Sequence, residues 1–224
     1  GDAMNDLKSI EQVADLLRQA KHLAILTGAG ISAESGIPTF RDALTGLWER
    51  FDAEDLATAD AYRRDKELVW GWYEWRRMKV LLSEPNLGHV AIARLAELVP
   101  QCTLITQNVD DLHERAGSQN VLHVHGSLHA PRCFSCDRPG NFPEGIPDEP
   151  EGGRRMKPPV CTHCGGNIRP GVVWFNEGLS PESLGSWRLT DTRRNRQWRL
   201  PPAPGCLVPA RAAGGISVQA SSWL

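Results

Sequence analysis

Apolar positions along the chain follow helical spacing in some segments and form short continuous runs in others. Between residues 8 and 21, a helix with one packed face is predicted by the spacing of Ile10, Val13, Leu16 and Leu17. Residues 23–26 then form an apolar run whose length fits a buried strand of a parallel sheet. Gly28 and Gly30 come next, so the predicted order is helix, strand and glycine-containing turn.

Helices and strands continue to alternate after residue 46. Residues 46–81 are mostly helical, with one shared face formed by Leu68, Val69, Trp72, Tyr73 and Arg76. Residues 86–98 form another amphipathic helix, whose apolar face is expected to hold Val90, Ala91, Leu95 and Leu98. Residues 102–106 are the second buried-strand candidate, and residues 121–128 are a third strand-like run that breaks at Gly126. This alternation indicates an α/β fold with a parallel sheet.

Composition narrows the class of protein. With 224 residues the chain can hold one large domain with a small insertion, and its net charge of −2 gives no general attraction to nucleic acid or to a membrane surface. No apolar run approaches the length of a membrane span, and residues 1–20 lack the apolar centre of a signal peptide. We therefore expect a cytoplasmic monomer without a membrane or nucleic-acid partner.

The glycine-containing turn after the first strand indicates a phosphate site. Gly28 and Gly30 allow backbone N–H groups to approach a diphosphate, and a helix that begins there directs its positive end toward the anion. The segment does not match G-x-G-x-x-G, because Ala33 stands at the last glycine position. A tight turn without a ligand would have the same composition, so this pattern alone leaves both interpretations open.

Polar residues follow the second and third strands. Residues 107–111 (QNVDD) come directly after the second strand, at the strand end where open α/β sheets bind ligands. The alternative is a solvated loop in which Asp110 or Asp111 caps the next helix. His123 and His125 share one side of a strand by its period of two, so spacing does not distinguish them. His125 stands last before a glycine break, where a general base could lie at the sheet edge.

Four of the six cysteines form two C-x-x-C pairs. Each turn directs two thiolates at one ion, and two turns complete the tetrahedron of a structural zinc site made by Cys133, Cys136, Cys161 and Cys164. The loop between the pairs is rich in proline, glycine and charge, so it has little core and needs the metal for stability. A nucleic-acid zinc ribbon is disfavoured by the acidic residues 144–151, and a redox dithiol by the pairing of two turns.

In combination, these segments resemble the sirtuin family of NAD-dependent protein-lysine deacylases. They are GAGIS (28–32), GIPTFR (36–41), TQNVD (106–110), HG (125–126), the two C-x-x-C pairs and RPGVVWF (169–175), in family order. The resemblance covers about residues 8–178. It implies a Rossmann-like parallel sheet with helices on both faces, formed by residues 8–128 and 168–224, and a small zinc-binding module inserted at residues 129–167.

The resemblance also implies a cleft between the two parts that binds NAD and an acyl-lysine protein or peptide. The implied cofactor-binding residues are Gly28, Ala29, Gly30, Ile31, Glu34, Phe40, Arg41, Trp48, Gln107, Asn108 and Asp110. In the family's chemistry the acyl oxygen attacks the ribose carbon as nicotinamide leaves. The histidine that matches His125 is the general base, and Asn108 is the second implied catalytic residue. The products are free lysine, nicotinamide and O-acyl-ADP-ribose.

Two further features imply the substrate. Tyr73 and Arg76 resemble the pair by which class III members hold the carboxylate of succinyl- or malonyl-lysine, and small residues at Ala53 and Ala57 leave room for that tail. The alternative is a core tyrosine beside a surface arginine. The segment formed by Val172, Val173, Trp174 and Phe175 resembles the family segment that pairs with the substrate backbone as an added strand. The expected function is removal of succinyl, malonyl or acetyl groups from protein lysine.

The chain departs from the family after residue 178. The G-T-S or G-S motif and the N-x-E motif, which contact the adenosine half of NAD in the family, are not found, and the sequence is atypical from about residue 185. The sheet is therefore expected to lack two parallel strands. The alternative functions are a catalytically impaired module that binds NAD or acyl peptide, ADP-ribosyl transfer or NAD hydrolysis, and a zinc-dependent interaction module.

Overall fold

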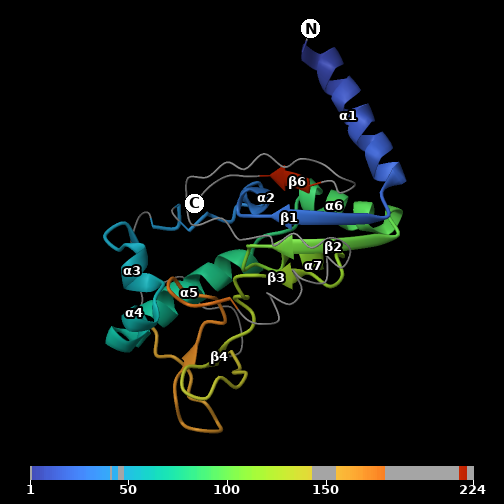
Figure 1. Cartoon of the computed structure of the whole chain (residues 1–224). Helices are drawn as coiled ribbons and strands as arrows, with labels where there is room; N and C mark the ends of the chain where they lie inside the picture. The colour runs from blue at the N-terminus through green and yellow to red at the C-terminus, as the bar shows by residue number, and fades with distance from the viewer. Residues whose placement is uncertain (1, 41, 45–47, 143–154, 180–216, 221–224) are drawn as a thin grey trace.

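The computed structural model describes residues 2–40, 42–44, 48–142, 155–179 and 217–220 (Figure 1). The helices are α1 (Asp2–Gln19), α2 (Gly30–Ala33), α3 (Ala53–Leu56), α4 (Ala59–Arg64), α5 (Lys66–Leu81), α6 (Leu87–Leu98) and α7 (Leu112–Arg115). The strands are β1 (His22–Thr27), β2 (Gln101–Thr106), β3 (Leu122–His123), β4 (Arg132–Cys133), β5 (Ile168–Arg169) and β6 (Ser217–Ala220). None of these helices is long and apolar enough to span a bilayer.

A four-stranded parallel sheet, in the order β3-β2-β1-β6, forms the centre of the larger part of the molecule. β1 pairs with β2 over its whole length, from His22 opposite Gln101 to Thr27 opposite Thr106. The carboxyl ends of both strands therefore lie side by side, and the loops that follow them meet at one edge of the sheet. The predicted parallel α/β architecture is confirmed, although the third strand is much shorter than the run at residues 121–128.

The described sheet contains one strand, β6, from the part of the chain after residue 185. Its residues pair in parallel with β1, with Ala24 opposite Ser217 and Thr27 opposite Ala220. One position beside β1 is therefore filled by a segment close to the end of the chain. The arginine- and proline-rich residues 193–209 lie outside the described part of the chain.

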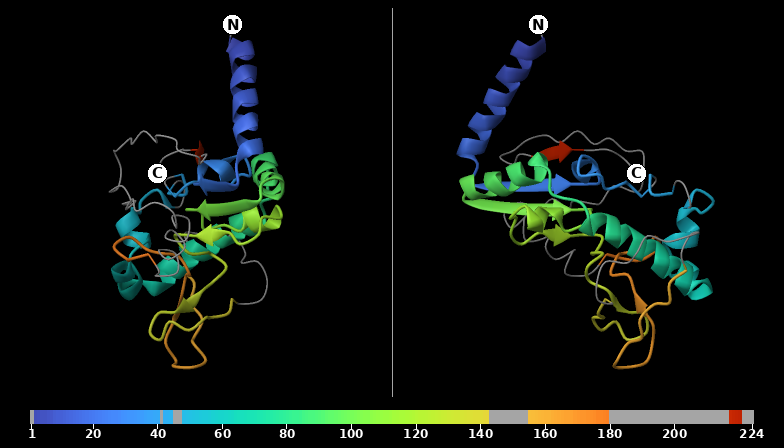
Figure 2. Two further views of the ribbon diagram at one scale, coloured as in Figure 1. Left: turned by 45° about the vertical axis from the view of Figure 1, so that its right-hand side comes forward. Right: turned by 180° about the vertical axis from the view of Figure 1, so that it is seen from behind.

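The predicted apolar face of α1 is wrong, although the helix itself is confirmed. Ile10, Val13 and Leu16 are 64%, 43% and 56% exposed, whereas Leu17 packs against the core beneath β1. Figures 1 and 2 show why, because α1 extends away from the rest of the described chain and only its last turn meets the sheet.

The buried face of α6 also differs from the prediction. Ala91 is exposed and Leu98 is 80% exposed, while His89 is fully buried and Ala93 nearly so. Of the predicted face, Leu95 packs against the core cluster that contains Leu23 and Ile25, and His89 is held by hydrogen bonds to Ser32 and Asn86. Apolar spacing thus identified the helix but not the face that it buries.

Aromatic side chains around α5 form the largest core cluster of the described residues, and Phe134 of a second, smaller lobe packs against it. This cysteine lobe consists of residues 129–142 and 155–169, where β4 pairs antiparallel with β5 (Figure 2). Tyr62 of α4 donates a hydrogen bond of 2.6 Å to the carbonyl of Ile168, and its ring lies 5.0 Å from that of Phe134. Trp70 of α5 stacks on Phe142 at 6.1 Å. The lobe is therefore anchored to α4 and α5 by aromatic contacts.

Candidate active site and metal centre

A buried polar network begins at the ends of the two central strands. Thr27 donates a hydrogen bond of 2.9 Å to the hydroxyl of Thr106, which in turn accepts the backbone N–H of Asn108 at 3.0 Å. His113 Nε2 lies 2.9 Å from the Thr27 hydroxyl. Since the Thr27 proton is directed at Thr106, His113 donates through Nε2. Burial lowers the pKa of His113 to about 4, which keeps this ring neutral.

The Ser32 hydroxyl is the centre of a second group of buried hydrogen bonds. It accepts from the Asn108 side-chain amide at 3.1 Å and donates to an Asp110 carboxylate oxygen at 2.9 Å. His89 Nε2 lies 3.3 Å from the same hydroxyl, and His89 Nδ1 accepts the backbone N–H of Asn86 at 3.2 Å. The His89 proton therefore sits on Nε2 and points at Ser32. These bonds fix the side chains of Asn108 and Asp110.

Asp110 takes the helix-capping position that the sequence offered to Asp110 or Asp111. One of its carboxylate oxygens binds Ser32, and the other accepts the backbone N–H of Leu112 at 3.1 Å, at the start of α7. Asp111, the other candidate, makes no capping hydrogen bond through its side chain. Asp110 is only 5% exposed, so its helix-capping bond and its contact with Ser32 hold the loop at the sheet edge together.

The two histidines that spacing did not separate differ in their ring nitrogens. Both nitrogens of His123 have protein partners, because Nδ1 lies 2.9 Å from the Asn108 carbonyl and Nε2 lies 2.5 Å from the Glu114 carboxylate. His125 is bonded through Nδ1 alone, to the Gln107 carbonyl at 3.2 Å. Because that carbonyl only accepts, Nδ1 of His125 carries the proton and Nε2 keeps its lone pair. The His125 ring is exposed, and burial of part of it lowers its pKa, which favours the neutral form.

The glycine-containing turn lies beside this polar edge. A Cβ atom at Gly28 would meet nothing nearer than the Gln107 side-chain oxygen at 3.9 Å, so the protein itself does not require glycine there. Within the described residues, the N–H groups of Ala29 and Gly30 have no hydrogen-bond acceptor. The helix that follows, α2, has four residues, so any anion would be bound mainly by these N–H groups rather than by a long helix dipole.

An aromatic group surrounds Arg76 on α5. The guanidinium lies 5.0 Å from the ring centre of Trp72, 5.7 Å from Phe40 and 5.9 Å from Tyr73, distances at which cations attract ring faces. No carboxylate or carbonyl binds Arg76 in the part of the chain that the structure describes. Burial lowers the pKa of Arg76, whereas Tyr73 and Asp110 oppose that change and favour the cation. Arg76 is therefore a partly buried charge without an anionic partner among these residues.

Tyr73 lies next to Arg76 with its ring 4% exposed, and burial raises its pKa to about 12. Ala57, one of the two small residues, packs in the same core cluster, while Ala53 is partly buried at the start of α3. Tyr73 is thus a neutral hydroxyl group at neutral pH, close to a cation and to a small side chain.

The remaining cofactor candidates differ in their surroundings. Phe40 contacts Trp72 edge-on at 5.1 Å and Phe175 at 5.8 Å. Trp48 is only 1% exposed and packs on other core rings. Glu34 is exposed at the end of α2, Ile31 packs near Gly88, and Arg41 lies outside the described residues.

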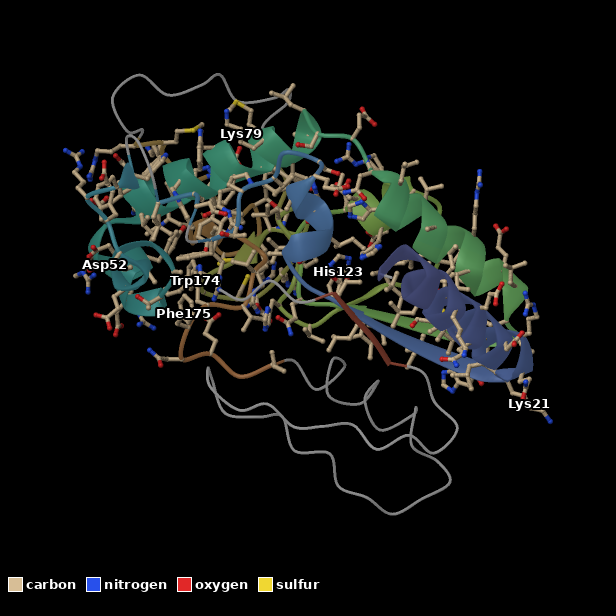
Figure 3. All side chains as sticks on the ribbon, turned by 90° about the horizontal axis from the view of Figure 1, so that it is seen from above. Lys21, Asp52, Lys79, His123, Trp174 and Phe175 are labelled. Carbon is tan, nitrogen blue, oxygen red and sulfur yellow. The ribbon has the colours of Figure 1, made fainter. Side chains whose placement is uncertain are left out.

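The segment from Val172 to Phe175 is not a regular strand. Its N–H groups already have acceptors: Val173 donates to the His125 carbonyl at 2.8 Å, Trp174 to the Glu177 carboxylate at 2.9 Å and Phe175 to the Ala57 carbonyl at 2.9 Å. Trp174 is buried, and Phe175 is 47% exposed beside it (Figure 3). The Val172 carbonyl accepts from Arg169 at 3.0 Å and the Trp174 carbonyl from the Glu177 N–H at 3.1 Å. An added peptide strand would therefore pair with the carbonyl oxygens of Val173 and Phe175.

Four thiol groups converge in the cysteine lobe. The sulfur atoms of Cys133, Cys136, Cys161 and Cys164 all lie within 4.8 Å of one another. Cys133 Sγ is 3.5 Å from Cys164 Sγ, and Cys136 Sγ is 3.7 Å from Cys161 Sγ. Tetrahedral zinc with bonds of about 2.3 Å needs sulfur atoms about 3.8 Å apart, so this donor set fits the ion.

Backbone geometry around the thiol groups supports the same site. The N–H groups of Ser135 and Cys136 point at Cys133 Sγ at 3.4 and 3.5 Å, an arrangement that favours thiolate. Gly166 is required for packing, since a Cβ there would lie 2.6 Å from the Ser135 hydroxyl oxygen. With four sulfur ligands the ion would have no open position, and its role would be structural.

Sequence reasoning missed most of the buried polar network. The residues that it did not single out are Thr27, Ser32, His89, Thr106 and His113. One signal was available, because both predicted parallel strands end in threonine and adjacent parallel strands bring such ends together. A second was the histidine three positions after Asn86, which completes a capping box at the start of α6.

Known proteins resemble the chain in sequence over most of its length. The pattern of the Sir2 family matches residues 28–192. An NAD-dependent protein deacylase of Methylococcus capsulatus is 64% identical over 163 residues, which are 73% of this chain and 64% of that protein. NAD-dependent protein deacylase 1 of Pseudomonas aeruginosa is 60% identical over 174 residues, which are 77% of this chain and 69% of that protein. The chain thus spans about two thirds of the length of these relatives.

Solved structures show the same fold. A Sir2 homologue in complex with NAD superimposes with a TM-score of 0.69 at 49% identity, covering 79% of this chain and 66% of that one. A Sir2 protein bound to a propionylated peptide gives a TM-score of 0.60 at 29% identity, covering 79% of this chain and 68% of that one. The Rossmann-like sheet inferred from the sequence is therefore confirmed.

Proposed function

Because the chain belongs to the Sir2 family, we propose that it catalyses NAD-dependent removal of acyl groups from protein lysine, releasing nicotinamide and O-acyl-ADP-ribose. The names of its relatives support this activity, as does the similarity to structures that hold NAD and a propionylated peptide. The observation in this chain that carries the proposal is the ring of His125. Its Nδ1–H is fixed on the Gln107 carbonyl, so Nε2 is available to accept a proton.

The roles of the other residues follow from their places at the sheet edge. We infer that the N–H groups of Ala29 and Gly30 hold the diphosphate and that Gln107, Asn108 and Asp110 hold the ribose and nicotinamide. NAD, when bound, supplies a ribose carbon from which nicotinamide can leave. His125 then takes the proton of a ribose hydroxyl through Nε2. The network through Ser32 keeps the Asn108 amide in one orientation for that step.

Arg76 supports an acidic acyl group as the preferred substrate. A partly buried guanidinium without an anionic partner among the described residues is costly, and a succinyl or malonyl carboxylate would supply the missing charge. Tyr73 adds a neutral hydroxyl donor beside the Arg76 guanidinium, and the small side chain of Ala57 leaves room for the acyl group. Acetyl-lysine lacks the carboxylate, so we expect it to be a weaker substrate that does not depend on Arg76.

NAD hydrolysis is the second candidate reaction. It is favoured by the exposure of His125 and Gln107, because water that reaches the ribose carbon could replace the acyl oxygen. The two reactions differ in their products, since hydrolysis forms ADP-ribose without consuming acyl-lysine.

A matched pair of arginine variants tests the substrate proposal. The assay measures deacylation of succinyl-, malonyl- and acetyl-lysine peptides by mass spectrometry, with wild type, Arg76→Met and the surface control Arg18→Met. Loss of a charge-assisted bidentate contact should lower kcat/KM for the acidic acyl groups by about 10–100-fold, with acetyl-lysine changed less than threefold. Equal loss for all three peptides would contradict the proposed role of Arg76.

The cellular setting is also part of the proposal. We infer a cytoplasmic monomer whose partners are acyl-lysine proteins. The net charge of −2 supports the expectation that nucleic acid is not a partner. We further propose that residues 129–167 act as a structural zinc module, held by the four converging sulfur atoms. Size-exclusion chromatography with light scattering would test the monomer, and metal analysis would test the zinc.

A further inference from the structure

His123 has a bonding pattern that defines its charge. Its two ring nitrogens face a backbone carbonyl of Asn108 and a carboxylate of Glu114, at 2.9 and 2.5 Å. Both partners can only accept hydrogen bonds, so both ring nitrogens must carry a proton to satisfy them. The geometry thus requires the imidazolium cation at this position.

Hydrogen bonds hold the backbone N–H, the backbone carbonyl and the side chain of Asn108. Its N–H is bound by the Thr106 hydroxyl at 3.0 Å, its carbonyl by His123 and its side-chain amide by Ser32 at 3.1 Å. Asn108 is 7% exposed, and Ser32 is the hydrogen-bond partner of its side chain among the residues that the structure describes. Three contacts from three separate segments therefore determine where the amide points. Of these three, only the contact from His123 can be switched by a proton.

Titratable groups surround His123 from two elements. Glu114 and His113 lie on α7, and Asp110 lies in the loop after β2. Burial lowers the pKa of His123, but the hydrogen bonds to Glu114 and to the Asn108 carbonyl, together with the charges of Glu114 and Asp110, raise it above its ordinary value overall. The neutral His113 contributes no charge near pH 7, since burial keeps its pKa at about 4.

We propose that His123, held in place by Glu114, is a positioning residue that fixes the peptide group of Asn108 and thereby the orientation of its side chain in the active site. This inference rests on the deacylase function proposed above, because Asn108 is assigned there to the ribose and nicotinamide. His123 does not touch substrate or cofactor in this account and acts through Asn108. His123 lies on β3, opposite Thr106 of β2.

The arrangement predicts a pH dependence that differs from that of the general base. His125 must be neutral to accept a proton, so activity rises as pH increases through its pKa. His123 must be charged to hold both partners, so activity falls as pH increases through its own, higher pKa. Loss of either proton breaks one of the two bonds and releases Asn108 or Glu114.

Glu114→Gln is the informative change, because it removes the charge while keeping the size and the hydrogen-bonding capacity of the side chain. Glu97→Gln, on the exposed face of α6, is the matched control. The histidine ring resonances of the 224-residue chain are titrated by NMR, and kcat and KM for a succinyl-lysine peptide are measured across pH. We expect the pKa of His123 to fall by about one unit in Glu114→Gln and the alkaline limb of kcat to move by the same amount. Neither should move in Glu97→Gln.

Two results would overturn the inference. One is a His123 pKa that stays the same in Glu114→Gln, and the other is an alkaline limb of kcat that does not follow the shift of the His123 pKa. Failure of the proposed function looks different. In that case no peptide is deacylated by the wild type, while the NMR titration still shows whether Glu114 holds His123 as a cation.

Discussion

Replacing Glu177 by Gln perturbs the ion pair that holds the segment from Val172 to Phe175. Arg169 Nη1 and Nη2 lie 2.6 and 2.9 Å from the two Glu177 oxygens, with side-chain exposures of 6% and 23%. The guanidinium also donates to the Val172 carbonyl and lies 3.6 Å from the Trp174 ring centre. The substitution leaves this buried cation without its anion.

The expected loss can be estimated from burial. Removing one partner of a fully buried ion pair costs about 3–5 kcal/mol, and the partial exposure of Glu177 reduces this to about 2–3 kcal/mol through solvent screening. For a chain of this size the melting temperature should fall by roughly 4–12 °C. The control is Glu97→Gln, whose exposed carboxylate should change the free energy of unfolding by less than about 0.5 kcal/mol. Urea and thermal unfolding followed by circular dichroism measure both variants.

The sign of the pH dependence gives a second test of the same pair. Burial raises the pKa of Glu177, but its bonds to Arg169 and to the Trp174 N–H lower it below its ordinary value of 4.5 overall. A depressed pKa means that the stabilisation is fully present above the unfolded-state pKa and is lost as pH falls through the folded-state pKa. The difference between wild type and Glu177→Gln should therefore shrink in acid. A difference below about 0.5 kcal/mol at pH 7, or one that does not depend on pH, would refute the reasoning.

Other changes test the base, the buried network and the metal. His125→Ala should lower kcat by about 10²–10⁴-fold while the calorimetric affinity for NAD changes less than threefold, and an unchanged kcat would exclude it as the base. The free energy of unfolding of the wild type should decrease as pH falls from about 6.5 to about 4, because His113 binds a proton in the unfolded chain over this range but not in the folded chain. In His113→Asn the free energy of unfolding should therefore depend less steeply on pH over this range. A dependence equal to that of the wild type would contradict the lowered pKa of His113. Cys161→Ser should abolish the zinc measured by plasma mass spectrometry and remove hydrogen-exchange protection from the cysteine lobe, whereas retained stoichiometric zinc would contradict the four-thiolate site.

Strand positions and the metal ligands were predictable because each depends on local sequence. A short apolar run followed by glycines defined β1, and the C-x-x-C spacing brought the four sulfur atoms together in the way expected. The face of α1 was not predictable, because its apolar stripe is typical of a packed helix, whereas no described element covers Ile10 or Val13. Burial depends on which neighbours are present, and periodicity carries no information about them.

The candidate site shows the same limit. His123 and His125 have equivalent positions in the sequence pattern, and only the three-dimensional arrangement shows that one uses both ring nitrogens on protein groups and the other uses one. Ser32 was visible in the GAGIS motif, yet its role depends on His89 and Asp110, which are distant in sequence. Polar networks of this kind form only after the strands pair, so spacing could not reveal them.

Product analysis tests the central proposal most directly. The 224-residue chain is incubated with NAD and a succinyl-lysine peptide, and free peptide, nicotinamide, O-succinyl-ADP-ribose and ADP-ribose are quantified by mass spectrometry. Unmodified peptide, nicotinamide and O-succinyl-ADP-ribose are expected to form in equal amounts, and His125→Ala is expected to form O-succinyl-ADP-ribose about 10²–10⁴-fold more slowly. Formation of nicotinamide and ADP-ribose with the succinyl peptide intact, or no consumption of NAD at all, would contradict the proposal.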